Sequence, residues 1–169
     1  MDRDRLRAVQ APLKDRYRQD PAAAMVTLRA SGELDGADVA CSVETGRALV
    51  AAGLHPATGG DGTLACSGDM LLQALVACAG VTLRSVATSL QIEVGGSVRA
   101  EGDLDFRGTL GVDRDAPVGF RAVRLLFELD TTADEEQLAT LMRLTERYCV
   151  VYQTLRGGVP VEVSASRSA

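Results

Sequence analysis

The four cysteines, Cys41, Cys66, Cys78 and Cys149, are the residues of this chain best suited to chemistry. A thiol can serve as a nucleophile, a metal ligand, a disulfide partner or a small core residue. Free cysteine is among the most buried residue types, so each cysteine taken alone is more simply interpreted as part of the core. The residues around each cysteine therefore decide which of them carries chemistry.

Other catalytic arrangements have little support in the sequence. The chain has one histidine, His55, and no C-x-x-C pair, so a zinc site would need four distant ligands to converge. A serine nucleophile would have only His55 as its base, and no G-x-S-x-G elbow is present. The segment "GGDG" (59–62) lacks the Lys-Ser/Thr pair that completes a phosphate loop. We therefore expect no bound metal or cofactor, and thiols remain the main candidates.

Size and charge restrict the partners of the chain. Its 169 residues suit one domain with a substantial core. A net charge of −5 disfavours nucleic acid, because phosphate binding needs a cationic surface. The charged N-terminus is unlike a signal peptide, and the apolar run 70–83 is shorter than a membrane-spanning helix. We expect a cytoplasmic protein that binds neither nucleic acid nor membrane, in a compartment where structural disulfides are rare.

Two helices are predicted to position Cys78 and Cys149. The first runs from Ser67, its expected N-cap, to about residue 89, with Asp69 in the first turn. It is apolar on nearly every face as far as residue 83, so we expect it to be buried on all sides. The second helix covers 134–147 and ends just before Cys149. Its apolar face is predicted to hold Leu138, Leu141, Met142, Thr145 and Tyr148.

Short alternating runs between turn residues predict strands. Their ranges are 24–32, 37–44, 47–55, 91–108, 119–131 and 159–166. A turn at 33–36 and a hairpin at 45–46 connect the first three. An amphipathic helix over 3–19 is interrupted by Pro12. Because the strand blocks are separate from the helices, we predict an α+β fold with mostly antiparallel sheet.

Two cysteine-containing segments carry a resemblance to a known family. The segment "GDMLLQALVACAGVTLRSVA" (68–87) looks like the central-helix signature of the OsmC/Ohr family, the osmotically induced and organic hydroperoxide resistance proteins. The segment "RYCVVYQTL" (147–155) resembles the second cysteine motif of that family. The spacing of the motifs and the order of elements also suit it. The resemblance, to the OsmC-like branch, implies one OsmC-like domain over 24–166, preceded by an N-terminal helical extension over 1–23.

The resemblance implies a fold and an activity. The fold would be α+β, with antiparallel sheets wrapped around the long buried central helices of an intertwined homodimer, and with active sites at the subunit interface. The activity would be a peroxiredoxin-like, antioxidant reduction of organic hydroperoxides, without a cofactor. Cys78 would be the peroxidatic thiol and become a sulfenic acid, and Cys149 would be the resolving thiol. An external dithiol reductant would reopen the resulting disulfide.

The chain departs from the family pattern at the group that activates the thiol. In the hydroperoxide resistance branch this group is an Arg in the loop after the first strand, held by a Glu near the start of the central helix. Here Leu34 aligns with the Arg, and Asp69 stands near the Glu position. Arg47 is our preferred replacement cation, and Arg29 or an Arg of the other subunit are the alternatives. On a straight helix Asp69 points about 180° away from the cysteine of its own helix.

Three functions therefore stay open. The favoured one is a thiol-dependent hydroperoxide reductase. The second is a non-catalytic OsmC-like dimer that binds a small apolar or electrophilic ligand, which the loss of the expected Arg motivates. In the third, every cysteine is a core residue.

Overall fold

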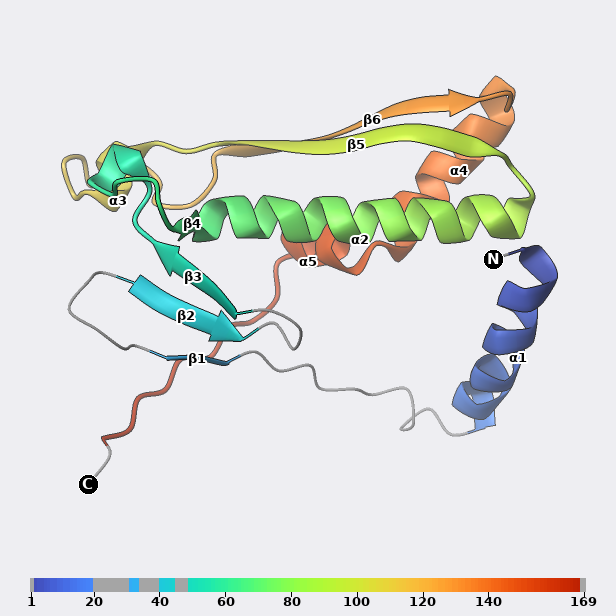
Figure 1. The fold of residues 1–169 in the computed structure, drawn as a ribbon, viewed down its shortest axis with the longest axis horizontal. Coiled ribbons are helices and arrows are strands. Elements are labelled where there is room, and N and C mark those ends of the chain that lie inside the picture. The colour runs from blue at the N-terminus through green and yellow to red at the C-terminus, as the bar shows by residue number, and fades with distance from the viewer. Residues whose placement is uncertain (1, 20–30, 34–39, 45–48, 168–169) are drawn as a thin grey trace.

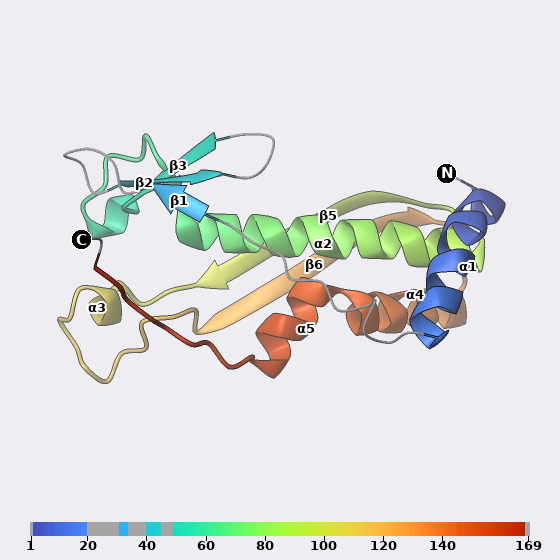
Figure 2. The same cartoon turned by 90° about the horizontal axis from the view of Figure 1, so that it is seen from below.

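The computed structural model of this chain describes residues 2–19, 31–33, 40–44 and 49–167. The long helix α2 (Ser67–Leu90) runs along the molecule. The strands β5 (Val94–Asp103) and β6 (Ala122–Thr131) form a ribbon that follows one side of α2. The helices α4 (Glu135–Tyr148) and α5 (Val150–Gly157) pack on a second side, as Figure 1 and Figure 2 show. Helix α1 (Arg3–Gln19) lies at the C-terminal end of α2, and it is continuous, so the predicted interruption at Pro12 is wrong.

A small sheet lies near the N-terminal end of α2 (Figure 1). Its strands, in spatial order, are β1 (Ser31–Glu33), β2 (Ala40–Glu44), β3 (Leu49–Gly53) and β4 (Ala65–Cys66). The first three pair antiparallel, as the predicted meander requires, and β4 joins β3 in parallel after the 3-10 turn η2 (Pro56–Thr58). The parts of the predicted strands, turn and hairpin that fall in 24–30, 34–39 and 45–48 lie outside the described residues.

The predicted central helix is confirmed, with a shift of one residue at its start. Cys66 has the extended backbone of the N-cap, and Ser67 is the first helical residue, so the predicted Ser67 cap is wrong. Asp69 lies in the first turn as predicted. The helix ends at Gln91, whose φ of 58° is left-handed and whose N–H bonds back to the carbonyls of Ala87 and Thr88.

The core forms along one stripe of α2. Its buried residues recur at helical spacing: Leu75, Ala79, Leu83 and Ala87. Leu83 and Ala87 pack with Val94 of β5 and with Leu141 of α4 in one cluster. Alternate side chains of β5 face this core, as in any pleated strand. β5 pairs antiparallel with β6 in a register that sets Val98 opposite Phe127.

The other side of α2 is not covered by the residues that the structure describes. The prediction that α2 is buried on all sides is therefore not met by the described residues of one subunit, because Val81 is 72% exposed. By length and composition alone α2 could cross a membrane, with a mean hydropathy of 1.6 over 18 residues of which 22% are buried. The core helix of a soluble protein passes the same test. Within the described part of one chain, this apolar side of α2 is thus exposed.

Helix α4 confirms the predicted amphipathic helix. Asp134 caps it by accepting a hydrogen bond from the Gln137 N–H (2.8 Å), and the Gln137 side chain accepts one from the Asp134 N–H (3.1 Å). Leu141 and Thr145 are buried as predicted. Tyr148 lies on the same face by its spacing, but it is 59% exposed at the end of the helix.

Two strand predictions are corrected. The strand after α2 ends at Asp103, because Asp105 accepts a hydrogen bond from the Arg107 N–H and starts the short helix α3 (Phe106–Thr109). Residues 158–167 form neither strand nor helix. Valines alternate there, but none of the described strands pairs with this segment, and Val163 is 91% exposed. A period of two makes a strand only where an edge is available to pair with.

Candidate thiol site

Cys149 is held at the junction of two helices. It is the C-cap of α4 and the N-cap of α5, with an extended backbone (φ −73°, ψ 107°). Its N–H donates to the Thr145 carbonyl (3.0 Å), and its carbonyl accepts from the Gln153 N–H (2.9 Å). The residue is 1% exposed. The junction fixes the Cys149 thiol at the start of α5, where the first N–H groups of the helix have no partner within the helix.

Cys78 faces this junction from α2. Its sulfur accepts hydrogen bonds from the backbone N–H groups of Val150 and Val151, the first two residues of α5. The thiol of Cys149 also donates to it. The hydroxyl of Thr82 completes the set, because a residue one turn further along α2 lies on the same face as Cys78. The two predicted catalytic cysteines are therefore brought together, and both are free thiols.

The surroundings shift the pKa values of the two thiols in opposite directions. Burial raises the pKa of Cys78, but the donors from Val151, Cys149, Val150 and Thr82 together lower that pKa below its ordinary value. Burial raises the pKa of Cys149, and the hydrogen bond that it donates to Cys78 raises this pKa further. The pair thus ionises first at Cys78. The nucleophilic form of cysteine is the thiolate, so Cys78 is the better nucleophile.

The N-terminus of α5 is the group that sequence reasoning missed. Its free N–H groups and the helix dipole favour a negative charge at this position without a guanidinium. Thr82 was also missed, although it follows Cys78 by four residues in the predicted helix, and this spacing places both side chains on one face. Backbone donors have no such signal, because any residue type supplies them.

The other predicted site residues stand apart from the thiols or outside the described chain. Asp69 is exposed in the first turn of α2, roughly 13 Å along the axis from Cys78 at 1.5 Å per residue. It is not among the groups that set the Cys78 pKa. Arg47, and its alternative Arg29, lie outside the described residues, so their part in the site stays a prediction. The same holds for Leu34.

Cys66 and His55 have structural positions of their own. Cys66 is the half-buried N-cap of α2 and is a free thiol. His55 caps η2 by accepting a hydrogen bond from the Ala57 N–H at Nδ1 (3.0 Å), and its ring stacks on Phe106 at 4.9 Å. No three His, Cys, Asp or Glu side chains gather as metal ligands within the part of the chain that the structure describes.

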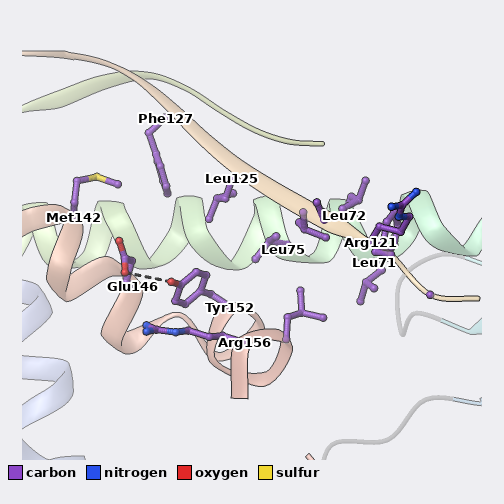
Figure 3. Close-up of a pocket in the computed structure, with 15 residues that line it drawn as sticks. Leu71, Leu72, Leu75, Arg121, Leu125, Phe127, Met142, Glu146, Tyr152 and Arg156 are labelled. Carbon is purple, nitrogen blue, oxygen red and sulfur yellow. Dashed lines mark hydrogen bonds between the residues drawn. The ribbon is translucent and has the colours of Figure 1, made fainter. Parts of the chain in front are cut away.

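An apolar cavity of about 750 Å³ adjoins the junction (Figure 3). Its walls come from α2, β6, α4 and α5 and include Leu71, Leu72, Leu75, Leu125, Phe127 and Met142. Arg121 lies at one end. At the other, the Tyr152 hydroxyl bonds to Glu146 (3.3 Å) beside Arg156. The Tyr152 N–H donates to the Cys149 sulfur, so this cavity approaches the thiol pair from the Cys149 side.

Known proteins resemble the chain in sequence pattern and in fold. The model of a family described as OsmC-like protein matches residues 60–164. The fold is similar to that of an OsmC-like protein from Mycoplasma pneumoniae, with a TM-score of 0.65 at 17% identity over 79% of this chain and 89% of that one.

Two further solved structures carry names that refer to hydroperoxides. One is an organic hydroperoxide resistance protein OsmC from Legionella pneumophila, described as a predicted redox protein (TM-score 0.57, 17% identity, 79% of this chain and 91% of that one). The other is the organic hydroperoxide resistance protein OhrB of Bacillus subtilis (TM-score 0.52, 19% identity, 79% and 93%). No curated protein matches the chain. At these identities the likeness of the structures supports the fold alone.

Proposed function

Since this chain belongs to the OsmC-like protein family, we propose that it is a thiol-dependent peroxidase that reduces organic hydroperoxides through Cys78 and Cys149. The observation that carries the proposal is the contact between the two thiols. The Cys149 thiol donates a hydrogen bond to the Cys78 sulfur, beside the N-terminal N–H groups of α5. The names of the relatives from Legionella and Bacillus support the same reaction class.

The proposed first step is attack of the Cys78 thiolate on the hydroperoxide ROOH. The sulfur takes one oxygen, the O–O bond breaks, and RO⁻ leaves with a proton as the alcohol ROH. Cys78 is thereby oxidised to the sulfenic acid by two electrons. The donors at the start of α5 and Thr82 hold the thiolate in place for this attack.

The proposed second step closes a disulfide. The Cys149 sulfur attacks the sulfur of the Cys78 sulfenic acid, an S–S bond forms, and the hydroxyl group leaves as water. The two thiols adjoin each other in the reduced protein, which places the Cys149 sulfur on the side of Cys78 from which it would attack. A dithiol reductant then takes the disulfide back to two thiols and becomes a disulfide itself. No metal or organic cofactor enters either step.

We also propose that the working form is a homodimer. The uncovered side of α2, with Val81 72% exposed, is the kind of apolar surface that a second subunit covers. The exposed valines of 159–163 supply further apolar surface that has no partner within the described chain. Cover from a second subunit would also bury the half-exposed Cys78.

A non-catalytic, ligand-binding protein is the second candidate function. The apolar cavity of about 750 Å³ favours it, because its volume lies within the range of small-molecule sites. The two functions differ in their dependence on Cys78. Binding in that cavity would survive a Cys78→Ser substitution, whereas peroxide reduction would not.

The test is consumption of cumene hydroperoxide in the presence of excess dithiothreitol. We expect turnover by the unchanged protein, loss of turnover to the background rate in Cys78→Ser, and normal turnover in Cys66→Ser, since Cys66 lies outside the junction. Equal turnover in the unchanged protein and Cys78→Ser would contradict the proposal.

A further inference from the structure

A second cavity, of about 510 Å³, lies between α1, α2 and α4. Helix α1 precedes the part of the chain that the family model matches. Leu6 and Gln10 of α1 are half-buried, and they share one face of the helix because they are four positions apart. Gln10 lines the cavity. The cavity thus has one wall that the family pattern does not include.

Helix α1 is fixed to the end of α2 by a specific contact. The Arg3 guanidinium donates to the Gln91 side-chain oxygen (2.7 Å), and Gln91 is the residue that ends α2. At the start of α1, Asp2 accepts a hydrogen bond from the Arg5 N–H (2.8 Å). The Asp2 contact caps the first turn of α1, and the Arg3 contact joins that turn to the end of α2. Figure 1 and Figure 2 both show α1 at this end of α2.

The cavity approaches the thiol pair from the Cys78 side. Thr82 lines it, and the Thr82 hydroxyl is one of the donors to the Cys78 sulfur. Tyr148 also lines it and directly precedes Cys149. The larger apolar cavity differs in this respect, because its link to the junction is the N–H of Tyr152, which bonds to Cys149. A hydroperoxide must reach the attacking sulfur, which favours the cavity that contains Thr82.

The lining of this cavity is mixed. Ser85, Ser89 and Gln10 supply polar groups, and Val81, Leu144 and neighbouring aliphatic side chains supply apolar surface. Because Val81 also belongs to the side of α2 that the proposed second subunit covers, the cavity lies at the edge of that surface. The Ser89 hydroxyl donates its proton to the Ser85 carbonyl (3.0 Å), so its oxygen is left as an acceptor. A ligand with an apolar body and a hydrogen-bonding oxygen matches such a wall.

We propose that the cavity between α1, α2 and α4 binds the organic part of the hydroperoxide, and that Gln10 of α1 determines the size of substrate that it admits. This inference rests on the proposed peroxidase function for its turnover readout. The substrate class is an organic hydroperoxide with an apolar body of moderate size, not hydrogen peroxide.

The test compares two tryptophan substitutions on α1 in the full-length protein. Gln10→Trp fills the cavity from its outer wall, whereas Ala11→Trp adds the same side chain at the exposed neighbouring position. For Gln10→Trp we expect kcat/KM toward cumene hydroperoxide to fall by about tenfold or more, with the value for hydrogen peroxide changed by less than about twofold. Ala11→Trp should behave like the unchanged protein. Equal losses toward both peroxides, or no loss toward either, would overturn the inference.

A binding measurement separates this inference from the peroxidase proposal. The alcohol 2-phenyl-2-propanol, which is the product of cumene hydroperoxide, is titrated into Cys78→Ser protein while backbone amide NMR shifts are followed. We expect shifts at Gln10, Ser85 and Tyr148, and about tenfold weaker binding when Gln10→Trp is added. This result does not depend on turnover, so it stands even if no hydroperoxide is reduced. Shifts confined to the α5 cavity, with binding lost in Leu155→Trp and kept in Gln10→Trp, would contradict it.

Discussion

The Cys149 thiol donates a hydrogen bond to the Cys78 sulfur from the residue that both ends α4 and caps α5. Cys149 therefore contributes to the lowered pKa of Cys78 in two ways. It supplies one donor through its own thiol, and it sets the first N–H groups of α5 against the same sulfur. The N-terminus of α5 thus stabilises the Cys78 thiolate with groups that the family pattern does not name.

The first prediction concerns the pH dependence of thiol reactivity. The Cys78 pKa is lowered from 9.0, so at a given pH below that value a larger fraction of Cys78 is thiolate than of a free cysteine. Its alkylation by iodoacetamide should rise with pH around a midpoint below 9.0, while Cys149, whose pKa is raised, should react only at higher pH. Peptide mass spectrometry across a pH series measures both. In urea the two midpoints should converge; a Cys78 midpoint at or above that of Cys149 in the folded protein would refute the assignment.

Replacement of Thr82 tests the donor on α2. Thr82→Val keeps the shape of the side chain but removes the hydroxyl, so the Cys78 pKa should rise. One hydrogen bond corresponds to about 0.5–1.5 kcal/mol, so the rate of alkylation near neutral pH should fall by roughly 2- to 12-fold. Thr88→Val is the matched control, because the Thr88 hydroxyl bonds to the Arg84 carbonyl of the same helix and not to a thiol. Equal alkylation rates in the two variants would show that the Thr82 hydroxyl does not stabilise the Cys78 thiolate.

The exposed side of α2 predicts the oligomeric state. Val81→Arg places a charge on the surface that a second subunit would cover, so it should shift a dimer toward monomer. Because Val81 also lines the cavity between α1, α2 and α4, the readout is the oligomeric state and not turnover. Val112→Arg introduces the same charge at a similarly exposed position in the loop before β6 and should leave the dimer intact. Sedimentation velocity at several concentrations measures the change. A monomeric parent protein, or a Val81→Arg variant that stays as dimeric as Val112→Arg, would contradict the proposed dimer.

The core around α2 predicts a large loss of stability on truncation. Leu141 is 0% exposed and packs against Leu83, Ala87 and Val94. Leu141→Ala should lower the free energy of unfolding by about 2–5 kcal/mol, because it removes buried methyl groups and leaves a cavity. Leu110→Ala, at a position 55% exposed, should change it by less than about 1 kcal/mol. Urea denaturation compares the two; similar losses would mean that this cluster is not the core.

Much of the fold could be predicted because long periodic segments carry a strong signal. The helices α2 and α4 and the pair β5–β6 follow from apolar residues that recur at the period of a helix or a strand. Helix α5 could not be predicted in this way. Its eight residues begin with Val150 and Val151, which favour strands, and its helical conformation depends on packing against α2.

The candidate site could be predicted only in part. The pairing of Cys78 with Cys149 came from the family resemblance, since nothing in the local pattern joins two residues so far apart in the chain. The activating donors could not be predicted, because they are backbone N–H groups whose position depends on where α5 begins. The alternating valines of 159–163 show the opposite case, in which a clear strand pattern has no partner within the described chain.

The central claim is that Cys78 and Cys149 form one redox pair, and peptide mapping after oxidation tests it most directly. The reduced protein is treated with one equivalent of cumene hydroperoxide, blocked with an alkylating agent, digested and analysed by mass spectrometry. We expect a Cys78–Cys149 disulfide, and in the Cys149→Ser variant a sulfenic acid at Cys78 that dimedone traps. A protein in which both cysteines stay reduced, or in which Cys66 is oxidised instead, would contradict the account.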